Sequence, residues 1–375
     1  MATHSPHTAP GEAAAVPERG GVRRERRRGR GATSNRSGRF EPLYRLDADD
    51  GWESLGELEA LDTHVQEQSA RTIITRNQSP DIGFDRSINA YRGCEHGCVY
   101  CYARPTHAFL GLSPGLDFET RLFAKVNAPD ALERELANPN YAPKTIALGT
   151  NTDPYQPVER RYRLTRRILE VLERTNHPVG IVTKSALVLR DLDILSAMAE
   201  RGLVKVALSV TTLERKLARA MEPRAATPEK RLAALETLSA AGIPTAVMIA
   251  PVIPALNDAE IETILARAAA AGVNEAGFVV LRLPLEIADL FNEWLEENYP
   301  DRAKRVMSLM RSMRGGKDYE AGWGKRMRGS GPYAWQIARR FELAAKRLRL
   351  NRRVYELETG LFEPPVLKGE QMRLF

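Results

Sequence analysis

Three cysteines close together are the residues of this chain best suited to chemistry. Cys94, Cys98 and Cys101 are its only cysteines, and they stand in the segment AYRGCEHGCVYCYARPTH. An odd number of cysteines in one short segment indicates metal ligation rather than disulfides. Cysteine thiolates hold iron–sulfur clusters, and a cubane cluster normally takes four of them. Three thiolates would therefore leave one iron free to bind a further molecule.

A zinc site is the main alternative for the same cysteines. Zinc accepts tetrahedral sets of three cysteines and one histidine, and His96 and His107 lie in or beside the cysteine segment. Structural zinc sites, however, usually draw their cysteines in pairs from separate loops. The spacing therefore favours an iron–sulfur cluster. A non-catalytic, zinc-stabilised nucleic-acid-binding protein remains the alternative hypothesis.

The chain around the cysteines alternates between short aliphatic runs and helical patterns. This alternation is typical of βα units around a parallel sheet, and Gly, Pro or polar residues bound each run. The six predicted strands are Ser87–Tyr91, Thr145–Gly149, Val179–Thr183, Lys205–Val210, Thr245–Pro251 and Ala276–Leu283. We therefore predict an α/β fold, a partial (β/α)6 barrel of the TIM type with N-terminal and C-terminal extensions. The cysteines follow the first strand, at the edge where such folds place active sites.

Composition divides the chain into four predicted regions. Residues 1–40 are rich in Gly, Pro, Ala and Arg and are predicted to be a disordered basic arm. Residues 41–85 form an N-terminal extension, and residues 86–300 form the barrel. Residues 301–375 are predicted to be a basic helical extension, with helices around Val306–Met313 and Ala334–Leu348.

The formal net charge of +7 is concentrated near the two ends of the chain. Such a charge suits a polyanionic partner, although basic runs also serve solubility alone. One C-terminal group combines cations with aromatic rings, as nucleic-acid-binding surfaces do. Its members are Trp323, Lys325, Arg326, Arg328, Tyr333 and Trp335. No apolar run reaches the ~20 residues that span a bilayer, so we expect a cytoplasmic protein without membrane contact.

The cysteine spacing, with an aromatic residue before the last cysteine, resembles that of the radical SAM superfamily. Over Cys94 to about Pro284, the segments CVYCYARPTH, DFETRLFAKVNAP, GTNTDPYQPVE, VTKS, MEPRAATPEKRL and LRLP are similar to the spore photoproduct lyase and DNA-repair-photolyase-like branch. The resemblance implies a [4Fe–4S] cluster on Cys94, Cys98 and Cys101 and S-adenosylmethionine (SAM) as the second cofactor. It also implies an electron donor such as flavodoxin or ferredoxin.

In that family, the amine and carboxylate of SAM chelate the open iron, and an electron from the cluster releases a 5′-deoxyadenosyl radical. The resemblance implies SAM contacts from the second strand end (Thr150, Asn151, Thr152 and Asp153), from the fourth (Ser209 and Thr211) and from Tyr100. Lys184, Arg224 and Arg282 are cations suited to the SAM carboxylate or a substrate phosphate. We expect a lyase-like or transferase-like enzyme that abstracts hydrogen.

The substrate is left open by the sequence. Lyases of this branch split a cross-linked thymine dimer and need a further cysteine to return a hydrogen atom, whereas this chain has no fourth cysteine. A nucleic acid bound by the basic patches is one candidate. RNA, protein or a small metabolite could be served by the same barrel with a different cleft lining.

Overall fold

The computed structural model of the protein describes residues 29–41, 61–353 and 355–367. Within these residues, no helix is both long enough and apolar enough to cross a membrane. Residues 1–28 of the predicted basic arm, residues 42–60 of the predicted N-terminal extension, and residues 354 and 368–375 lie outside the described residues.

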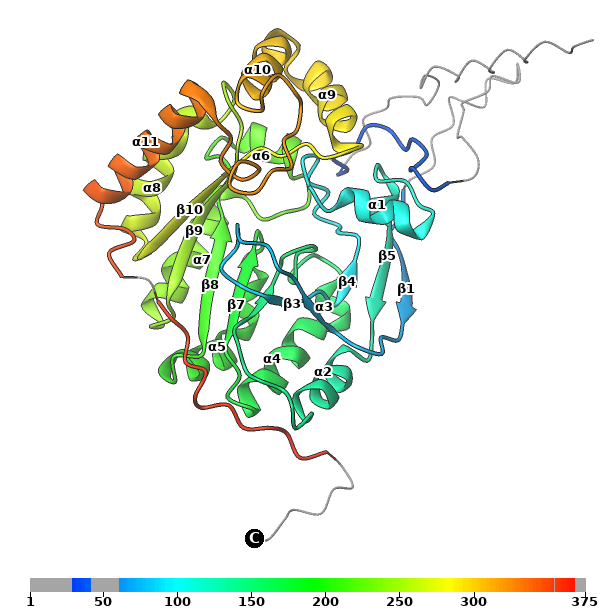
Figure 1. Ribbon diagram of the computed structural model, residues 1–375, viewed down its shortest axis with the longest axis vertical. Coiled ribbons are helices and arrows are strands. Elements are labelled where there is room, and N and C mark those ends of the chain that lie inside the picture. The colour runs from blue at the N-terminus through cyan, green and yellow to red at the C-terminus, as the bar shows by residue number, and fades with distance from the viewer. Residues whose placement is uncertain (1–28, 42–60, 354, 368–375) are drawn as a thin grey trace, which may run out of the picture.

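A seven-stranded sheet forms the centre of the molecule (Figure 1), with the strand order β10-β9-β8-β7-β6-β3-β2. Neighbouring strands from β3 to β10 pair in parallel, whereas β2 pairs antiparallel with β3 at one edge. The strands are β2 (Ile74–Arg76), β3 (Arg86–Ile88), β6 (Ile146–Leu148), β7 (Val179–Thr183), β8 (Val204–Ser209), β9 (Thr245–Val252) and β10 (Glu275–Val280). Because β3 and β10 do not pair with each other, the barrel is open, as predicted.

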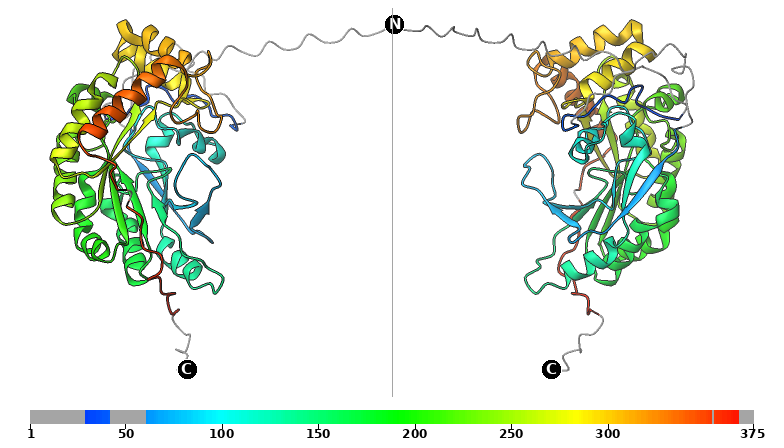
Figure 2. Two further views of the ribbon diagram at one scale, coloured as in Figure 1. Left: turned by 60° about the vertical axis from the view of Figure 1, so that its left-hand side comes forward. Right: turned by 90° about the vertical axis from the view of Figure 1, so that its right-hand side faces the viewer.

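Helices follow the strands and cover the outer face of the sheet, as Figure 2 shows. Their bounds in the described residues are α1 (Asp117–Thr120), α2 (Ala128–Leu136), α3 (Glu159–Tyr162), α4 (Leu164–Arg174), α5 (Leu192–Glu200), α6 (Arg215–Met221), α7 (Pro228–Ala240), α8 (Ile261–Ala270), α9 (Ile287–Asn298), α10 (Pro300–Ser312) and α11 (Gly331–Arg347). Thr227 caps α7 by accepting from the Lys230 amide. The core between helices and sheet is aliphatic; Val206, Val247 and Ile249 are fully buried.

The first predicted strand, Ser87–Tyr91, is divided in the structure. It ends at Ile88 as β3, and the chain then enters a second, three-stranded sheet of order β1-β5-β4. The strands of this sheet are β1 (His64–Gln68), β4 (Tyr91–Arg92) and β5 (Arg121–Lys125). The break occurs at Asn89, whose side-chain oxygen accepts from the amides of Asn151 and Thr152 at 3.1 and 3.4 Å. This bond turns the chain toward the loop that follows β6.

Residues 29–41 correct the prediction of a disordered arm over residues 1–40. In this segment Ala32 and Ser34 are only 1% exposed, and the Ala32 amide donates to the Glu119 carboxylate at 2.8 Å. Backbone hydrogen bonds to a buried carboxylate compensate for the small apolar content of the segment. Its composition alone gave no sign of this partner.

The C-terminal extension contains the two predicted helices, as α10 and α11. Helix α11 packs on α8, and the loop between α10 and α11 returns to the end of β10. There the Val280 amide donates to the Met327 carbonyl at 2.9 Å, and Arg314 donates to the Leu281 carbonyl at 2.8 Å. The extension is thus attached at the carboxyl edge of the sheet.

Candidate active site

The cysteine loop, residues 93–103, runs from β4 into a 3-10 helix over Arg104–Leu110. Tight turns shape it: the Gly97 amide donates to the Cys94 carbonyl at 3.3 Å, and the Cys101 amide donates to the Cys98 carbonyl at 3.2 Å. All three cysteines are free thiols; Cys94 and Cys98 are buried and Cys101 is half-buried. Short-range turns therefore bring the three thiols together at the carboxyl edge of the barrel.

Each buried thiol is hard to ionise in the protein alone. Burial raises the pKa of Cys94 well above its usual value, and the charges of Asp153, Cys98 and Cys101 raise it further. Burial also raises the pKa of Cys98 to about 12, although Lys184 opposes this change. A bound cation favours the thiolate forms of Cys94 and Cys98, because metal ligation requires deprotonated thiols. This donor set therefore fits a cationic metal centre.

The contacts of the histidines argue against the zinc alternative. Across the described residues, no group of three or more His, Cys, Asp or Glu side chains is arranged to hold a single metal ion. His96 pairs with Asp153 at 3.3 Å, and the ring of His107 packs on Phe118 while its Nε2 contacts the Arg121 carbonyl at 2.9 Å. Thiolates of a cubane cluster bind separate irons and need not converge on one point. The residues therefore fit a [4Fe–4S] cluster better than zinc.

Asp153, predicted to contact the SAM amine, is held by groups of the protein itself. Its carboxylate accepts from the Thr183 hydroxyl at 2.6 Å and from the Lys184 amide at 2.8 Å, and it pairs with His96. Burial would raise the pKa of Asp153, but the His96 charge and these hydrogen bonds outweigh it, so the pKa is lowered. The Asp153 amide also points at the Cys94 sulfur. Asp153 thus joins the loop after β6 to β7 and to the cysteine loop.

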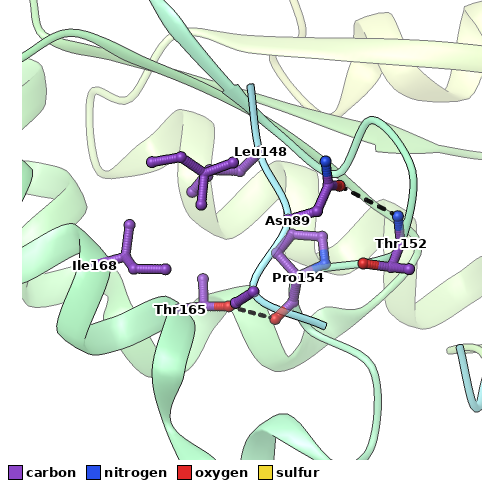
Figure 3. A pocket seen from close by; sticks show the side chains of 8 residues that line it. Asn89, Leu148, Thr152, Pro154, Thr165 and Ile168 are labelled. Carbon is purple, nitrogen blue, oxygen red and sulfur yellow. Dashed lines mark hydrogen bonds between the residues drawn. The ribbon is translucent and has the colours of Figure 1, made fainter. Parts of the chain in front are cut away.

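The other predicted residues of this loop divide into two groups. Thr152 is buried, and its hydroxyl donates to the Tyr91 carbonyl at 3.2 Å. It also lines a small pocket behind the loop, shown in Figure 3, which includes Asn89 and Ile168 but none of the three cysteines. Thr150 and Asn151 stay partly exposed. Of the four residues predicted in the loop after β6, Thr150 and Asn151 are therefore the two that a ligand can reach.

A buried ion pair between Glu222 and Arg231, here called the inner pair, forms hydrogen bonds with three further residues that are predicted to contact SAM. The Glu222 carboxylate accepts from the Thr211 hydroxyl at 2.6 Å and from the Tyr100 hydroxyl, and it pairs with Arg231. Arg231 in turn donates to the Ser209 carbonyl at 2.9 Å. Tyr100, Ser209 and Thr211, which are predicted to contact SAM, therefore lie around one buried pair, whereas Glu222 and Arg231 were not predicted. Both residues lie in the segment MEPRAATPEKRL, in which charged residues directly adjoin the apolar residues Met221 and Leu232, and this was the only sequence feature that could have indicated them.

A second buried pair, here called the outer pair, consists of Arg104 and Glu119, which lie 2.5 Å apart and are both fully buried. Arg104 donates to the carbonyls of Cys98 at 2.8 Å and Gly97 at 3.2 Å. Sequence reasoning missed this pair too. Its two members stand in the segments CYARPTH and DFETR, whose residue pattern does not show that they pair.

The three predicted cations have different surroundings. Arg224 pairs with Glu95 at 3.1 Å. The Lys184 nitrogen lies 5.8 Å from the centre of the Tyr100 ring; burial lowers its pKa, but Cys98 and Glu222 raise it more, so it stays charged. Arg282 lies 4.8 Å over the Tyr102 ring. Lys184 and Arg282 have no ion pair with a carboxylate among the described residues, so both suit an anionic ligand.

An open α/β barrel with three thiols at its carboxyl edge defines a class of metal-dependent barrel enzymes. The Radical SAM superfamily model matches residues 88–268. An uncharacterized protein of Mycobacterium tuberculosis is 39% identical over 232 residues, which cover 61% of this chain and 68% of that protein. An uncharacterized protein of Methanocaldococcus jannaschii is 32% identical over 214 residues, covering 57% and 76%. The chain belongs to the radical SAM superfamily.

Solved structures agree on the fold. Spore photoproduct lyase complexed with dinucleoside spore photoproduct has a TM-score of 0.55 and 18% identity, covering 76% of this chain and 79% of that chain. A mutant of that lyase with bound AdoMet and the same dinucleoside has a TM-score of 0.52 and 17% identity, covering 76% and 78%. The likeness confirms the predicted partial barrel. Membership of the family implies a [4Fe–4S] cluster and SAM.

Proposed function

We propose that this protein is a radical SAM enzyme that abstracts a hydrogen atom from a nucleic-acid substrate bound at the open mouth of its barrel. Cys94, Cys98 and Cys101 would hold the [4Fe–4S] cluster. When bound and reduced by a flavodoxin or ferredoxin, the cluster supplies the electron that splits SAM into methionine and a 5′-deoxyadenosyl radical. The remaining tasks, which are binding, orientation and exclusion of water, fall to the side chains around the cysteine loop.

Side chains at the carboxyl ends of the strands support SAM binding beside the cysteines. The inner pair holds the side chain of Tyr100 in the cysteine loop and that of Thr211 just after β8. The Lys184 ammonium, which has no carboxylate within ion-pair distance among the described residues, suits the SAM carboxylate. Thr150 and Asn151 offer neutral hydrogen-bonding groups at a partly exposed edge. Asp153 and Thr152 act behind them by holding the loop in place.

The proposal of a nucleic-acid substrate rests on one observation, a row of arginine–aromatic pairs at the barrel mouth. Arg282 lies over Tyr102, which directly follows Cys101, and contacts the Tyr319 hydroxyl at 3.5 Å. Arg326 lies 4.5 Å over the ring of Trp323, which is 58% exposed. Bases stack on such rings, and the Arg282 guanidinium, which has no ion pair with a carboxylate among the described residues, suits the phosphates between them.

The row of pairs lies within electrostatic range of the cysteines. Desolvation raises the pKa of Tyr102 and the charge of Cys101 raises it further, whereas Arg282, Lys184 and Arg326 lower it. The loop that carries Trp323 is fixed because Asp81 accepts from the Gly324 amide at 2.7 Å and pairs with Arg326. A strand stacked on this surface would therefore lie beside the site where hydrogen is abstracted.

The cofactor part of the proposal is tested first. The protein is reconstituted anaerobically with iron and sulfide, and 5′-deoxyadenosine is measured chromatographically after SAM and dithionite are added. A brown protein with an absorption band near ~400 nm that forms deoxyadenosine is expected of a three-thiolate cluster. A colourless protein that binds one zinc and leaves SAM intact would support the non-catalytic zinc protein instead.

The substrate part is tested by binding of single-stranded and duplex DNA and RNA at several salt concentrations. Trp323→Ala should weaken binding by ~5–150-fold, since one base–aromatic stack contributes about 1–3 kcal/mol. Tyr355→Ala is the matched control, because Tyr355 is also an exposed aromatic residue, at 49%, but its amide bonds Glu275 at the start of β10, away from the mouth. Equal effects of the two substitutions, or no binding by the unchanged protein, would contradict a nucleic-acid site at the mouth.

A further inference from the structure

We propose that residues 29–41 form a strap that covers the outer side of the cysteine loop, and that the outer pair Arg104–Glu119 positions the loop for its cluster. The inference rests on the proposed cluster. The strap lies outside residues 88–268, which match the family model. It therefore adds a part to the site that the matched region does not contain.

The strap and the loop meet at two glycines. A Cβ atom on Gly31 would lie 1.8 Å from the Gly97 carbonyl oxygen and 3.3 Å from the Val99 amide nitrogen. Gly97 has a φ of +66°, and a Cβ atom there would lie 2.6 Å from a Glu119 carboxylate oxygen. No larger residue fits at either position without moving backbone or a buried carboxylate. The strap is therefore in direct backbone contact with the peptide that precedes Cys98.

The Glu119 carboxylate connects the strap to the loop. It accepts from the amides of Gly31 and Ala32 at 2.9 and 2.8 Å and from the Arg104 guanidinium at 2.5 Å. Arg30 adds a bond to the Glu119 carbonyl at 3.0 Å. A fully buried carboxylate with these three donors is well satisfied, and two of the donors belong to the strap. Loss of the strap would leave Glu119 short of two partners.

Arg104 connects the Glu119 carboxylate to the backbone around Cys98. Its guanidinium donates to the carbonyls on both sides of the Cys98 Cα, those of Gly97 and Cys98. Because the peptide bond is planar and trans, fixing a carbonyl also fixes the amide that points the opposite way. Arg104 also donates to the carbonyls of Pro114 and Gly115 at 3.0 and 2.9 Å, so it cannot rotate freely. The direction of the Cys98 side chain is thereby set.

The middle of the strap is fastened to α1 and α9, between which it runs in Figure 1. The Asn35 amide group donates to Asp117 at 3.0 Å. The Ser34 hydroxyl donates to Glu293 at 2.7 Å, and Arg36 pairs with Glu293 at 2.8 Å. A segment held by contacts of residues 30–36 over a buried loop excludes water and small oxidants from that side of the loop. We infer that it protects the cluster.

Gly31→Val tests the strap in the full-length protein, because the side chain would collide with the Gly97 carbonyl. Gly83→Val is the matched control, since a Cβ atom at Gly83 meets nothing within 4 Å. We expect the reconstituted Gly31→Val protein to lose its ~400 nm band in air roughly tenfold faster than the control. The reason is that a displaced strap loses about two hydrogen bonds and opens more often. The unfolding temperature of the metal-free proteins is measured in parallel.

Arg104→Lys tests the positioning role with a variant that keeps the charge opposite Glu119. A lysine ammonium lacks the planar, forked donors with which Arg104 binds the Gly97 and Cys98 carbonyls at the same time. We therefore expect lower iron and sulfide content and an altered electron paramagnetic resonance spectrum. Unchanged cluster lifetime in Gly31→Val, or an unchanged spectrum in Arg104→Lys, would overturn the proposal. An unchanged protein that takes up no cluster would instead overturn the proposed function, and the two failures are thus distinguishable.

Discussion

The cysteine loop lies between two buried arginine–glutamate pairs that look alike but have different neighbours. In the outer pair, Glu119 accepts from Arg104 and from backbone amides of the strap. In the inner pair, Glu222 accepts from Arg231 and from two hydroxyl groups that belong to the predicted SAM site. In the outer pair both members bind backbone groups, whereas in the inner pair Arg231 binds backbone carbonyls and Glu222 holds side chains.

The pairs also differ in their electrostatic relation to the thiols. Beyond burial, the leading charges that act on the pKa of Cys98 are Lys184, Glu222, Cys101 and Arg231. Glu119 and Arg104 are not among them, although Arg104 bonds the Cys98 carbonyl. Buried ion pairs can thus serve two distinct purposes on one loop. We infer that the outer pair governs how firmly the cluster is held and the inner pair governs its electronic properties.

The largest expected effect follows from Cys98, which both pairs approach. Cys98→Ser keeps the carbonyl that bonds Arg104 but removes the thiolate. SAM cleavage should fall by more than the ~10–100-fold that loss of an outer-shell partner costs a metal site, while the metal-free protein unfolds at an unchanged temperature. Iron content, deoxyadenosine formation and thermal unfolding measure the three quantities. Retained iron with full SAM cleavage would remove Cys98 from the ligand set.

Glu222→Gln and Glu119→Gln together test the division of labour. Removing the negative charge of Glu222 near a thiolate ligand should raise the midpoint potential of the cluster by on the order of 50 mV, which corresponds to a Coulomb interaction of about 1 kcal/mol. Glu119→Gln should leave the potential unchanged and shorten the lifetime of the cluster in air. Redox titration followed by absorption measures both variants. A larger potential shift in Glu119→Gln would reverse the assignment.

The sequence predicted the fold well because local patterns encode it. Aliphatic runs bounded by glycine and polar residues located all six parallel strands, and strand β7 has the predicted bounds Val179–Thr183. The departures arise from single polar contacts between distant residues. Asn89 ends β3 by bonding amides after β6, and Glu119 orders the strap within the predicted disordered arm. Neither contact has a periodic signature in the sequence.

The sequence indicated candidate cluster ligands but not the charged residues that support them. Cysteine spacing is local, so Cys94, Cys98 and Cys101 were found together. The supporting charges come from separate segments, since Arg104 and Glu119 are 15 residues apart and Glu222 reaches Tyr100 from 122 residues away. One sequence read along the chain cannot reveal such pairs. The carboxylate of Asp153, a residue predicted to contact SAM, accepts from Thr183 and pairs with His96 within the protein.

A separate prediction concerns acid stability, which must be distinguished from the behaviour of the loop. His177 precedes β7 at the amino edge of the barrel, away from the cysteines. Its Nε2 accepts from the Tyr141 hydroxyl at 2.7 Å, and its Nδ1 donates to the Pro178 carbonyl at 3.0 Å. Burial lowers the pKa of His177 to about 4, since the buried ring resists protonation.

The sign of the pH effect follows from this lowered pKa. Between pH ~6.5 and ~4 the unfolded chain binds the proton and the folded protein does not, so acidification favours unfolding. The contribution of His177 is complete above pH ~6.5 and is lost as the pH falls toward 4, by up to about 3 kcal/mol. His177→Gln should flatten the fall in unfolding free energy over this interval, measured by denaturant titration of the metal-free protein. An equally steep fall would show that groups other than His177 cause the acid sensitivity over this interval.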